Sequence, residues 1–99
     1  MKVLAVNTAN MLLSLALTED GQVLEAFESP ETRDQGNLLL RHIRDALAKR
    51  NWRYEDLNLL AVVTGPGSFT GIRIGIAAMR GLSLAAEVPM TGLSSFDLF

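Results

Sequence analysis

Cysteine is absent from this chain of 99 residues, and histidine, tryptophan and tyrosine occur only once each. The lack of cysteine excludes a disulfide framework and a thiolate metal site. A metal site needs about three or four converging ligands. The single His42 has only Asp45 close by at a helical spacing. We therefore expect no metal and no cofactor.

Long hydrophobic runs are absent as well. No apolar stretch approaches the ~20 residues that span a bilayer, and the first polar residues come too early for a signal peptide. These features predict a cytoplasmic protein without membrane contact.

Neither sign of charge dominates the chain. Its formal net charge is −2, which argues against a domain built mainly to bind phosphate backbones. Hydrophobic residues make up 48% and charged residues 20%, a balance typical of globular proteins. The length suits one small domain, or part of a larger protein, with a modest core.

The pattern of apolar residues predicts five strands and two helices. Short apolar or alternating runs between turn residues predict the strands, and Asp20-Gly21 between two such runs is a hairpin signal. Apolar residues at three- and four-residue spacings predict the helices. The predicted strands are residues 3–6, 11–17, 22–28, 59–64 and 88–92, and the predicted helices are residues 37–50 and 70–86.

This order, β-β-β-α-β-α-β, predicts an α/β fold with a mixed five-stranded sheet. The run at residues 59–64 is almost entirely apolar, so we expect it to be buried on both faces. Trp52 is expected to cover the core where the first helix ends. Residues 93–97 have the pattern of another helix start, with a serine as its cap.

The most specialised segment runs from Gly65 to Arg73, between a predicted buried strand and a predicted helix. Its glycines permit unusual backbone conformations, and Ser68 or Thr70 could cap the helix. Amides at a helix start attract anions, but the segment lacks the lysine and the spacing of a Walker loop. A structural turn and an anion site both remain open for Gly65, Gly67, Ser68, Thr70, Gly71 and Arg73.

The second predicted helix carries small side chains along one side. Gly71 and Gly75 lie one turn apart at its start, and Gly81 lies further along. Glycine inside a helix costs about 1 kcal/mol relative to alanine, which suggests a compensating close approach of another backbone. That backbone belongs either to this chain or to a second subunit. The small side comprises Ile74, Ala77, Ala78, Gly81 and Ala85.

The run from Gly65 to Gly75, Gly-Pro-Gly-Ser-Phe-Thr-Gly-Ile-Arg-Ile-Gly, closely resembles the signature of the TsaB family, also called YeaZ. Residues 3–8 and 92–95 fit the same family pattern. The resemblance covers essentially the whole chain, but only the N-terminal of the two lobes usual in the family. It implies an actin/hexokinase-type, ribonuclease H-like lobe, with the second lobe absent.

The resemblance also implies a role in making N6-threonylcarbamoyladenosine (t6A37) in tRNA. Members of the family are non-catalytic companions that pair with a homologous catalytic subunit, TsaD, and a small ATPase, TsaE, joins them. They also self-associate through the same two helices, and they meet tRNA only through the complex. Older annotation places the group with M22-type glycoproteases.

Two departures from the family pattern bear on chemistry. Asn7 stands where the family usually has an aspartate near nucleotide phosphates and metal. Gln35-Gly36-Asn37 stands where the family usually has His-Ser. Both weaken a nucleotide or metal role. An ATP- or phosphate-binding enzyme lobe, kinase-like or peptidase-like, is nevertheless the alternative hypothesis, and direct tRNA binding is a third.

The leading hypothesis is an accessory subunit without catalytic residues. Ser68 and Thr70 have no general base within reach in the sequence pattern, so both are interpreted as caps. The two predicted helices would pack against the matching pair of a TsaD-like subunit or a second copy. The expected interface residues are Leu39, Ile43, Ile74, Ala78, Met79 and Gly81.

Overall fold

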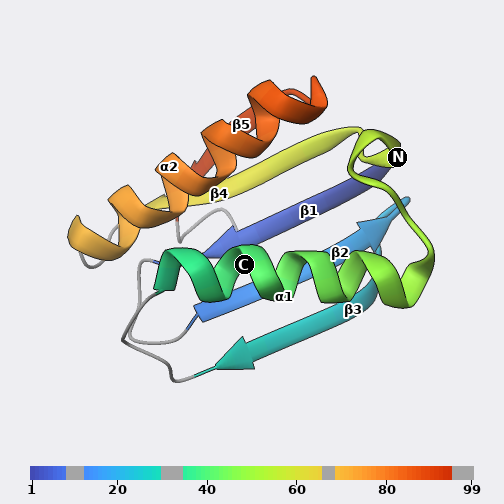
Figure 1. The fold of residues 1–99 in the computed structure, drawn as a ribbon, viewed down its shortest axis with the longest axis horizontal. Coiled ribbons are helices and arrows are strands. Elements are labelled where there is room, and N and C mark those ends of the chain that lie inside the picture. Colours follow the sequence, from blue (N-terminus) through green and yellow to red (C-terminus); the bar gives the residue numbers. More distant parts are fainter. Residues whose placement is uncertain (9–12, 30–34, 66–68, 95–99) are drawn as a thin grey trace.

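A computed structural model describes residues 1–8, 13–29, 35–65 and 69–94 of the chain. Its strands form one five-stranded sheet in the order β3-β2-β1-β4-β5 (Figure 1). Strands β1, β2 and β3 are antiparallel neighbours, whereas β4 and β5 extend the sheet in parallel. The predicted mixed sheet and element order are confirmed.

The chain opens with an antiparallel meander of β1 (Lys2–Asn7), β2 (Leu13–Glu19) and β3 (Gln22–Ser29). The turn between β2 and β3 consists of Asp20 and Gly21, with φ angles of 52° and 84°. Positive φ at both central residues matches the right-handed twist of a two-residue hairpin, which is why Asp-Gly is favoured there. The predicted hairpin is confirmed.

Strand β4 (Leu59–Gly65) lies between β1 and β5 (Met90–Ser94). Consecutive residues at its centre, Leu60 to Val63, are all buried, so both faces of the strand are covered. Continuous apolar sequence without alternation is the expected signature of such a strand. The prediction for this segment is confirmed.

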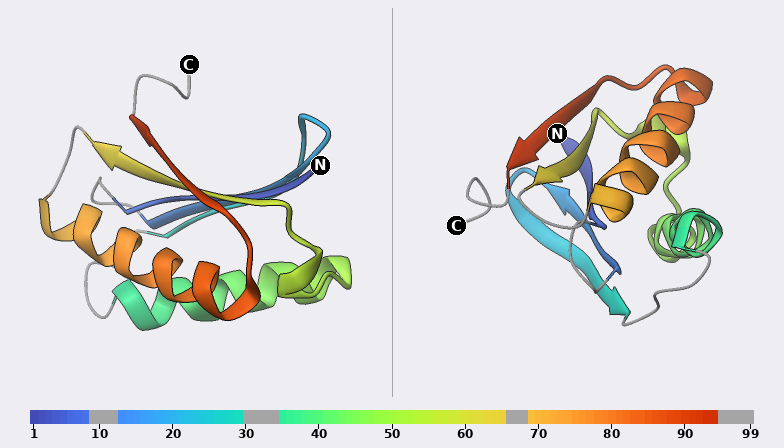
Figure 2. Two further views of the ribbon diagram at one scale, coloured as in Figure 1. Left: turned by 90° about the horizontal axis from the view of Figure 1, so that it is seen from above. Right: turned by 90° about the vertical axis from the view of Figure 1, so that its left-hand side faces the viewer.

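Helices α1 (Gln35–Arg50) and α2 (Phe69–Ala86) both cover the same face of the sheet (Figure 2). Helix α2 packs mainly on β4, and α1 lies over β2 and beside α2. The core fills the space between this helical layer and the sheet. Its buried apolar residues include Leu4, Val6, Leu13, Leu15, Leu17, Leu39, Ile43, Leu47, Leu60, Val62 and Met79.

The last strand begins two residues later than predicted. Val88 does not pair in the sheet, because its backbone N–H donates to the carbonyl of Ser83 and so closes the end of α2. Glu87 adopts a positive φ of 57° at this exit, and Pro89 has no N–H to offer a strand. The strand therefore starts at Met90 and runs to Ser94. The helix predicted from residue 93 is wrong for residues 93 and 94, and its remainder lies outside the described residues.

Trp52 packs against the core just after α1, as predicted, and the ammonium group of Lys2 lies 5.1 Å from the centre of its ring. A short 3-10 turn, η1 (Tyr54–Asp56), follows. The backbone N–H of Arg53 donates to Oδ2 of Asp56 at 2.8 Å. This hydrogen bond, with added attraction from the charges of Arg53 and Lys2, lowers the pKa of Asp56 below its ordinary 3.8.

A lowered carboxyl pKa in the folded protein implies a pH-dependent contribution to stability. The contribution is fully present above 3.8, the pKa in the unfolded chain, and is lost as pH falls through the lower folded value. We expect Asp56→Asn to lower the melting temperature at neutral pH, with a difference from the unmodified protein that shrinks in acid. Thermal melts of both proteins from neutral pH to below 3.8 check this. A difference independent of pH would contradict it.

Candidate protein-interaction surface

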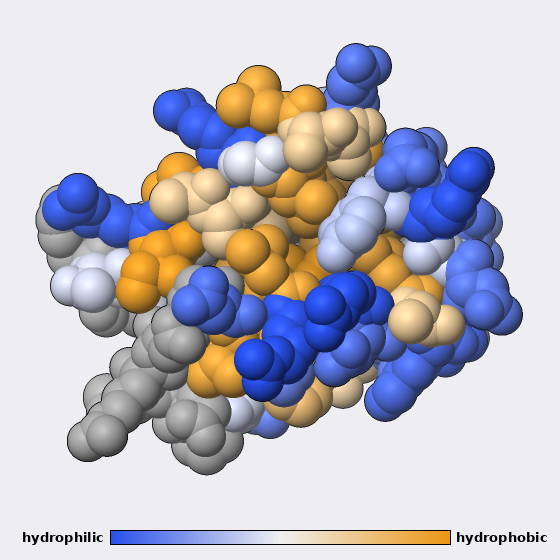
Figure 3. All heavy atoms as spheres, in the orientation of Figure 1, coloured by the Kyte–Doolittle hydropathy of each residue, from blue (hydrophilic) through white to orange (hydrophobic). Residues whose placement is uncertain are grey.

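The helical layer presents an outer surface that no described part of the chain covers. Figure 3 views this side and shows hydrophobic surface in the middle of the face, with hydrophilic groups around and between. Two large apolar side chains on it are exposed, Leu40 of α1 at 42% and Leu84 of α2 at 76%. A contiguous apolar area on a surface is a common mark of an interaction site.

The inner side of α2 explains one of its glycines. A Cβ at Gly75 would collide with the hydroxyl of Thr8 and lie 3.3 Å from a methyl group of Val62. Thr8 is fully buried, and its hydroxyl donates a hydrogen bond to the carbonyl of Gly71. The close approach signalled by Gly71 and Gly75 is therefore to the chain's own sheet. Thr8 was not singled out from the sequence, because glycine spacing shows that something approaches but not what.

Gly81 has a different environment. A Cβ built there meets nothing within 4 Å, so the position is open. Ile74, Ala78 and Gly81 recur at four- and three-residue steps and so share one flank of the helix. Ile74 and Ala78 are only partly buried in the chain. This flank, which we call the small-residue flank, also includes Ala85 and leaves room for another backbone.

Three of the expected interface residues need correction. Leu39, Ile43 and Met79 are fully buried and belong to the core between helices and sheet. The apolar spacing of each helix identifies the stripe of residues that it buries. The largest side chains on that stripe pack against the chain's own sheet. These side chains cannot meet a partner without opening the core. Ile74, Ala78 and Gly81 stay a prediction as interface residues.

The glycine turn is only partly within the described residues. Gly65 ends β4, while Gly67 and Ser68 lie outside the described part. Helix α2 already begins at Phe69, so Thr70 lies inside its first turn and is not the residue before it. The alternative that Thr70 is the cap is therefore wrong.

Thr70 and Arg73 do come together on the outside of α2. With Ile74 and Ala77 they line a shallow hollow of about 350 Å³. Gly71, by contrast, faces inward and accepts the hydrogen bond from Thr8. The turn residues thus divide between a structural contact and the outer surface. Anion binding at this turn stays a prediction.

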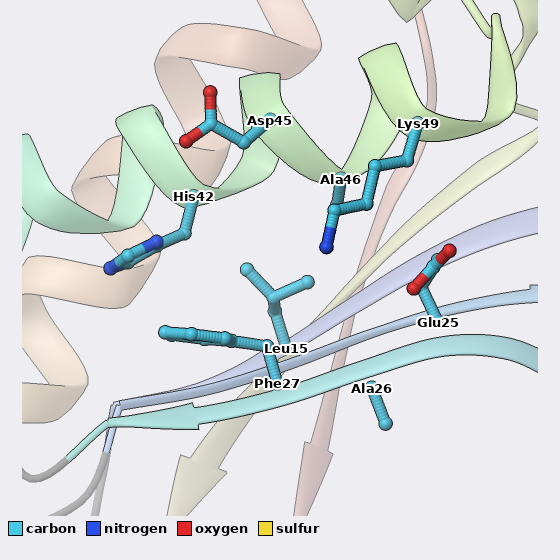
Figure 4. Close-up of a pocket in the computed structure, with 8 residues that line it drawn as sticks. All are labelled: Leu15, Glu25, Ala26, Phe27, His42, Asp45, Ala46 and Lys49. Carbon is cyan, nitrogen blue, oxygen red and sulfur yellow. The ribbon is translucent and has the colours of Figure 1, made fainter.

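A second hollow, of about 230 Å³, lies between α1 and strands β2 and β3 (Figure 4). Phe27 and His42 lie against one another, with ring centroids 4.1 Å apart and planes tilted by 35°. The Asp45 carboxylate points away from the sheet, and Lys49 reaches toward it. His42 therefore packs on an aromatic ring. No group of three or more metal-binding side chains assembles within the described ranges.

One ion pair joins α1 to the edge of the sheet beside this hollow. The guanidinium of Arg50 donates to the carbonyl of Leu24 at 2.5 Å and to the carboxylate of Glu25 at 3.2 Å. This contact fixes the end of the helix over the edge strand β3.

Among the described helices, none is both long and apolar enough to cross a membrane.

Comparison with known proteins agrees with this architecture. A family model described as TsaD: tRNA N6-adenosine threonylcarbamoyltransferase matches residues 30–99. The chain is 43% identical over 95 residues to the tRNA threonylcarbamoyladenosine biosynthesis protein TsaB of Escherichia coli, covering 96% of this chain and 41% of that protein. It is 27% identical over 97 residues to TsaB of Bacillus subtilis, covering 98% and 42%. The chain thus spans about two fifths of the length of these curated relatives.

Solved structures give the same result. YeaZ from Pseudomonas aeruginosa superposes with a TM-score of 0.85 at 31% identity, covering 94% of this chain and 43% of that one. RuvC of Thermus thermophilus superposes with a TM-score of 0.67 at 12% identity, covering 95% and 64%, a likeness of fold alone. The fold is an α/β lobe of the ribonuclease H-like, actin/hexokinase type. The chain therefore belongs to the family whose model is described as TsaD, and within it to the TsaB (YeaZ) group.

Proposed function

We propose that this chain is the N-terminal lobe of an accessory subunit in the biosynthesis of threonylcarbamoyladenosine in tRNA. In this proposal it pairs through α1 and α2 with a TsaD-like catalytic subunit in the cytoplasm. A TsaE-like ATPase joins the pair, tRNA is met only through the complex, and the chain alone forms a homodimer. The names of the curated relatives and the matching family model support the pathway.

One observation on α2 is the main support for pairing through the two helices. Gly81 lies in the middle of α2 with open space around it, although glycine there costs about 1 kcal/mol relative to alanine. Nothing inside the described chain uses that space. A helix from another subunit, packed along the small-residue flank, would gain close backbone contact from the missing side chain. The exposed Leu40 and Leu84 would add apolar contact nearby.

A role without catalysis is supported by the contacts of the polar side chains. The Thr8 hydroxyl is committed to the carbonyl of Gly71, and His42 packs on Phe27. Each of these groups thereby has a structural partner. In a nucleophile–base pair the two reactive side chains would instead contact one another. We therefore assign the chemistry of the pathway to the partner subunit.

The test is to fill the open space at Gly81. Gly81→Trp is expected to leave the melting temperature nearly unchanged, because the position has room. It should weaken pairing with the TsaD-like subunit by tenfold or more, which is a loss of at least about 1.4 kcal/mol of binding free energy. Isothermal titration calorimetry measures the affinity. Glu55→Trp, at an exposed site outside both helices, is the control for adding a tryptophan. Unchanged affinity of Gly81→Trp would contradict the proposed surface.

A further inference from the structure

Basic residues are concentrated on the two helices. Helices α1 and α2 contain six of the nine Lys and Arg residues of the chain but only one of its eleven Asp and Glu residues. The helical layer therefore carries a formal charge of +5, while the whole chain carries −2. The acidic character of the chain resides elsewhere, in the sheet, the turns and the ends.

Four of the six basic side chains are arginines on the outer surface, whereas Arg50 and Lys49 reach toward the sheet. Arg41 and Arg44 of α1 and Arg80 of α2 are exposed. Arg73, Ala77, Arg80 and Leu84 recur at four- and three-residue steps, so they share the outermost face of α2. Arginine and apolar residues thus alternate along the same face, next to the small-residue flank.

We propose that this charge selects the partner: the two-helix face binds a protein whose matching helices carry acidic side chains more tightly than a second copy of this chain, so the homodimer forms only when that partner is absent. The inference rests on the proposed function and adds to it the chemistry of the partner. The apolar middle provides the contact area. The arginines that alternate with the apolar residues decide which protein is accepted, because complementary charge across an interface favours the right partner and like charge disfavours the wrong one.

Self-pairing through the same face meets a cost that follows from symmetry. In a two-fold dimer the same patch meets itself, so a face with the four exposed arginines and Asp45, of formal charge +3, would meet another of +3. Like charges brought together across an interface repel, whereas acidic residues opposite them attract. Salt screens both effects, with a screening length of about 10 Å at 0.1 M. Salt should therefore weaken pairing with an acidic partner and strengthen self-pairing.

An RNA partner fits the surface less well. Phosphates would pair with the arginines, but they would gain nothing from the apolar residues between them. Leu84 is 76% exposed and Leu40 is 42% exposed on this same layer. Exposed leucines beside alanines and a glycine favour helix packing, so a protein partner accounts for both features of the surface.

The experiment measures two associations of the purified protein, one with the TsaD-like subunit of the same organism and one with itself. Titration calorimetry and analytical ultracentrifugation are run between about 50 and about 500 mM salt, a range over which screening becomes strong. Arg80→Glu is the variant, and Arg53→Glu, whose side chain is 77% exposed outside both helices, is the control with the same change in charge. We expect salt to lower the affinity for the subunit and to raise self-association. At low salt, Arg80→Glu should bind the subunit about five- to tenfold more weakly and dimerise more tightly, with the control unchanged.

Three results would overturn the inference. Binding to the subunit that is equally tight at all salt concentrations and in Arg80→Glu would leave the proposed function intact and remove the role of charge. Loss of tRNA binding by Arg80→Glu in a filter-binding assay, with subunit affinity unchanged, would assign the arginines to RNA. If no complex with the subunit formed at any salt concentration, both the proposed function and this inference would be contradicted.

Discussion

Gly75→Ala is expected to lower the free energy of unfolding by about 2–4 kcal/mol, because one added methyl group must displace a buried hydroxyl. The Cβ would collide with Oγ1 of Thr8 and press on the Val62 methyl 3.3 Å away. Moving the hydroxyl also breaks its bond to the carbonyl of Gly71 inside a fully buried site. The gain in helix propensity, about 1 kcal/mol, does not offset these two losses.

Gly81→Ala is the matched control for this substitution. The same methyl group, added six residues further along α2, meets nothing within 4 Å. It should stabilise the protein by about 0.5–1 kcal/mol through helix propensity and reduced freedom of the unfolded chain. Urea unfolding of both variants gives the two free energies. Equal effects at the two positions would contradict the assignment of Gly75 to the contact with the sheet.

Leu39→Ala is expected to lower the free energy of unfolding by about 2–5 kcal/mol, the usual range for a fully buried leucine. Leu39 is completely buried between α1 and the sheet, where its removal leaves a cavity among closely packed neighbours. Leu39→Ala should reduce pairing with the TsaD-like subunit only because part of the variant is unfolded. Where the variant is fully folded, its affinity for the subunit should equal that of the unmodified protein.

Leu40→Ala provides the contrast, because the adjacent side chain is 42% exposed. Its truncation should change stability by less than about 1 kcal/mol and should weaken pairing with the TsaD-like subunit while the fold persists. Circular dichroism melts and titration calorimetry separate the two effects. If Leu39→Ala reduced pairing while fully folded, Leu39 would have to be assigned to the interface after all.

Much of the fold could be predicted from local patterns. The alternation of apolar residues, the Asp20-Gly21 turn and the unbroken apolar run from Leu59 to Val63 each depend on interactions within a few residues. These signals are the ones that the structure confirms. Val88 was wrongly predicted to begin the last strand. Its backbone N–H instead donates to the carbonyl of Ser83 at the end of α2, a contact that the local apolar pattern does not show.

The candidate surface was harder to predict than the fold. Spacing identifies the stripe Leu39–Ile43–Leu47 as apolar, but spacing does not say whether a sheet or a second subunit covers it. The same limit applies to Gly75 and Gly81. Both are glycines inside a predicted helix, but a side chain at Gly75 would collide with Thr8, whereas a Cβ at Gly81 meets nothing within 4 Å. The concentration of arginine on both helices was present in the sequence. It became a surface property only once the two helices were found side by side.

The amino-acid order by itself determined the elements, the mixed sheet and the family resemblance, because turns, periodicity and the glycine-rich signature are short-range features. Only the tertiary structure decided which apolar residues close the core, which glycine receives Thr8 and which leaves a space. The reason is physical. Burial and close approach are set by segments far apart in the chain, such as Thr8 and Gly75, whose distance is not encoded by either segment alone.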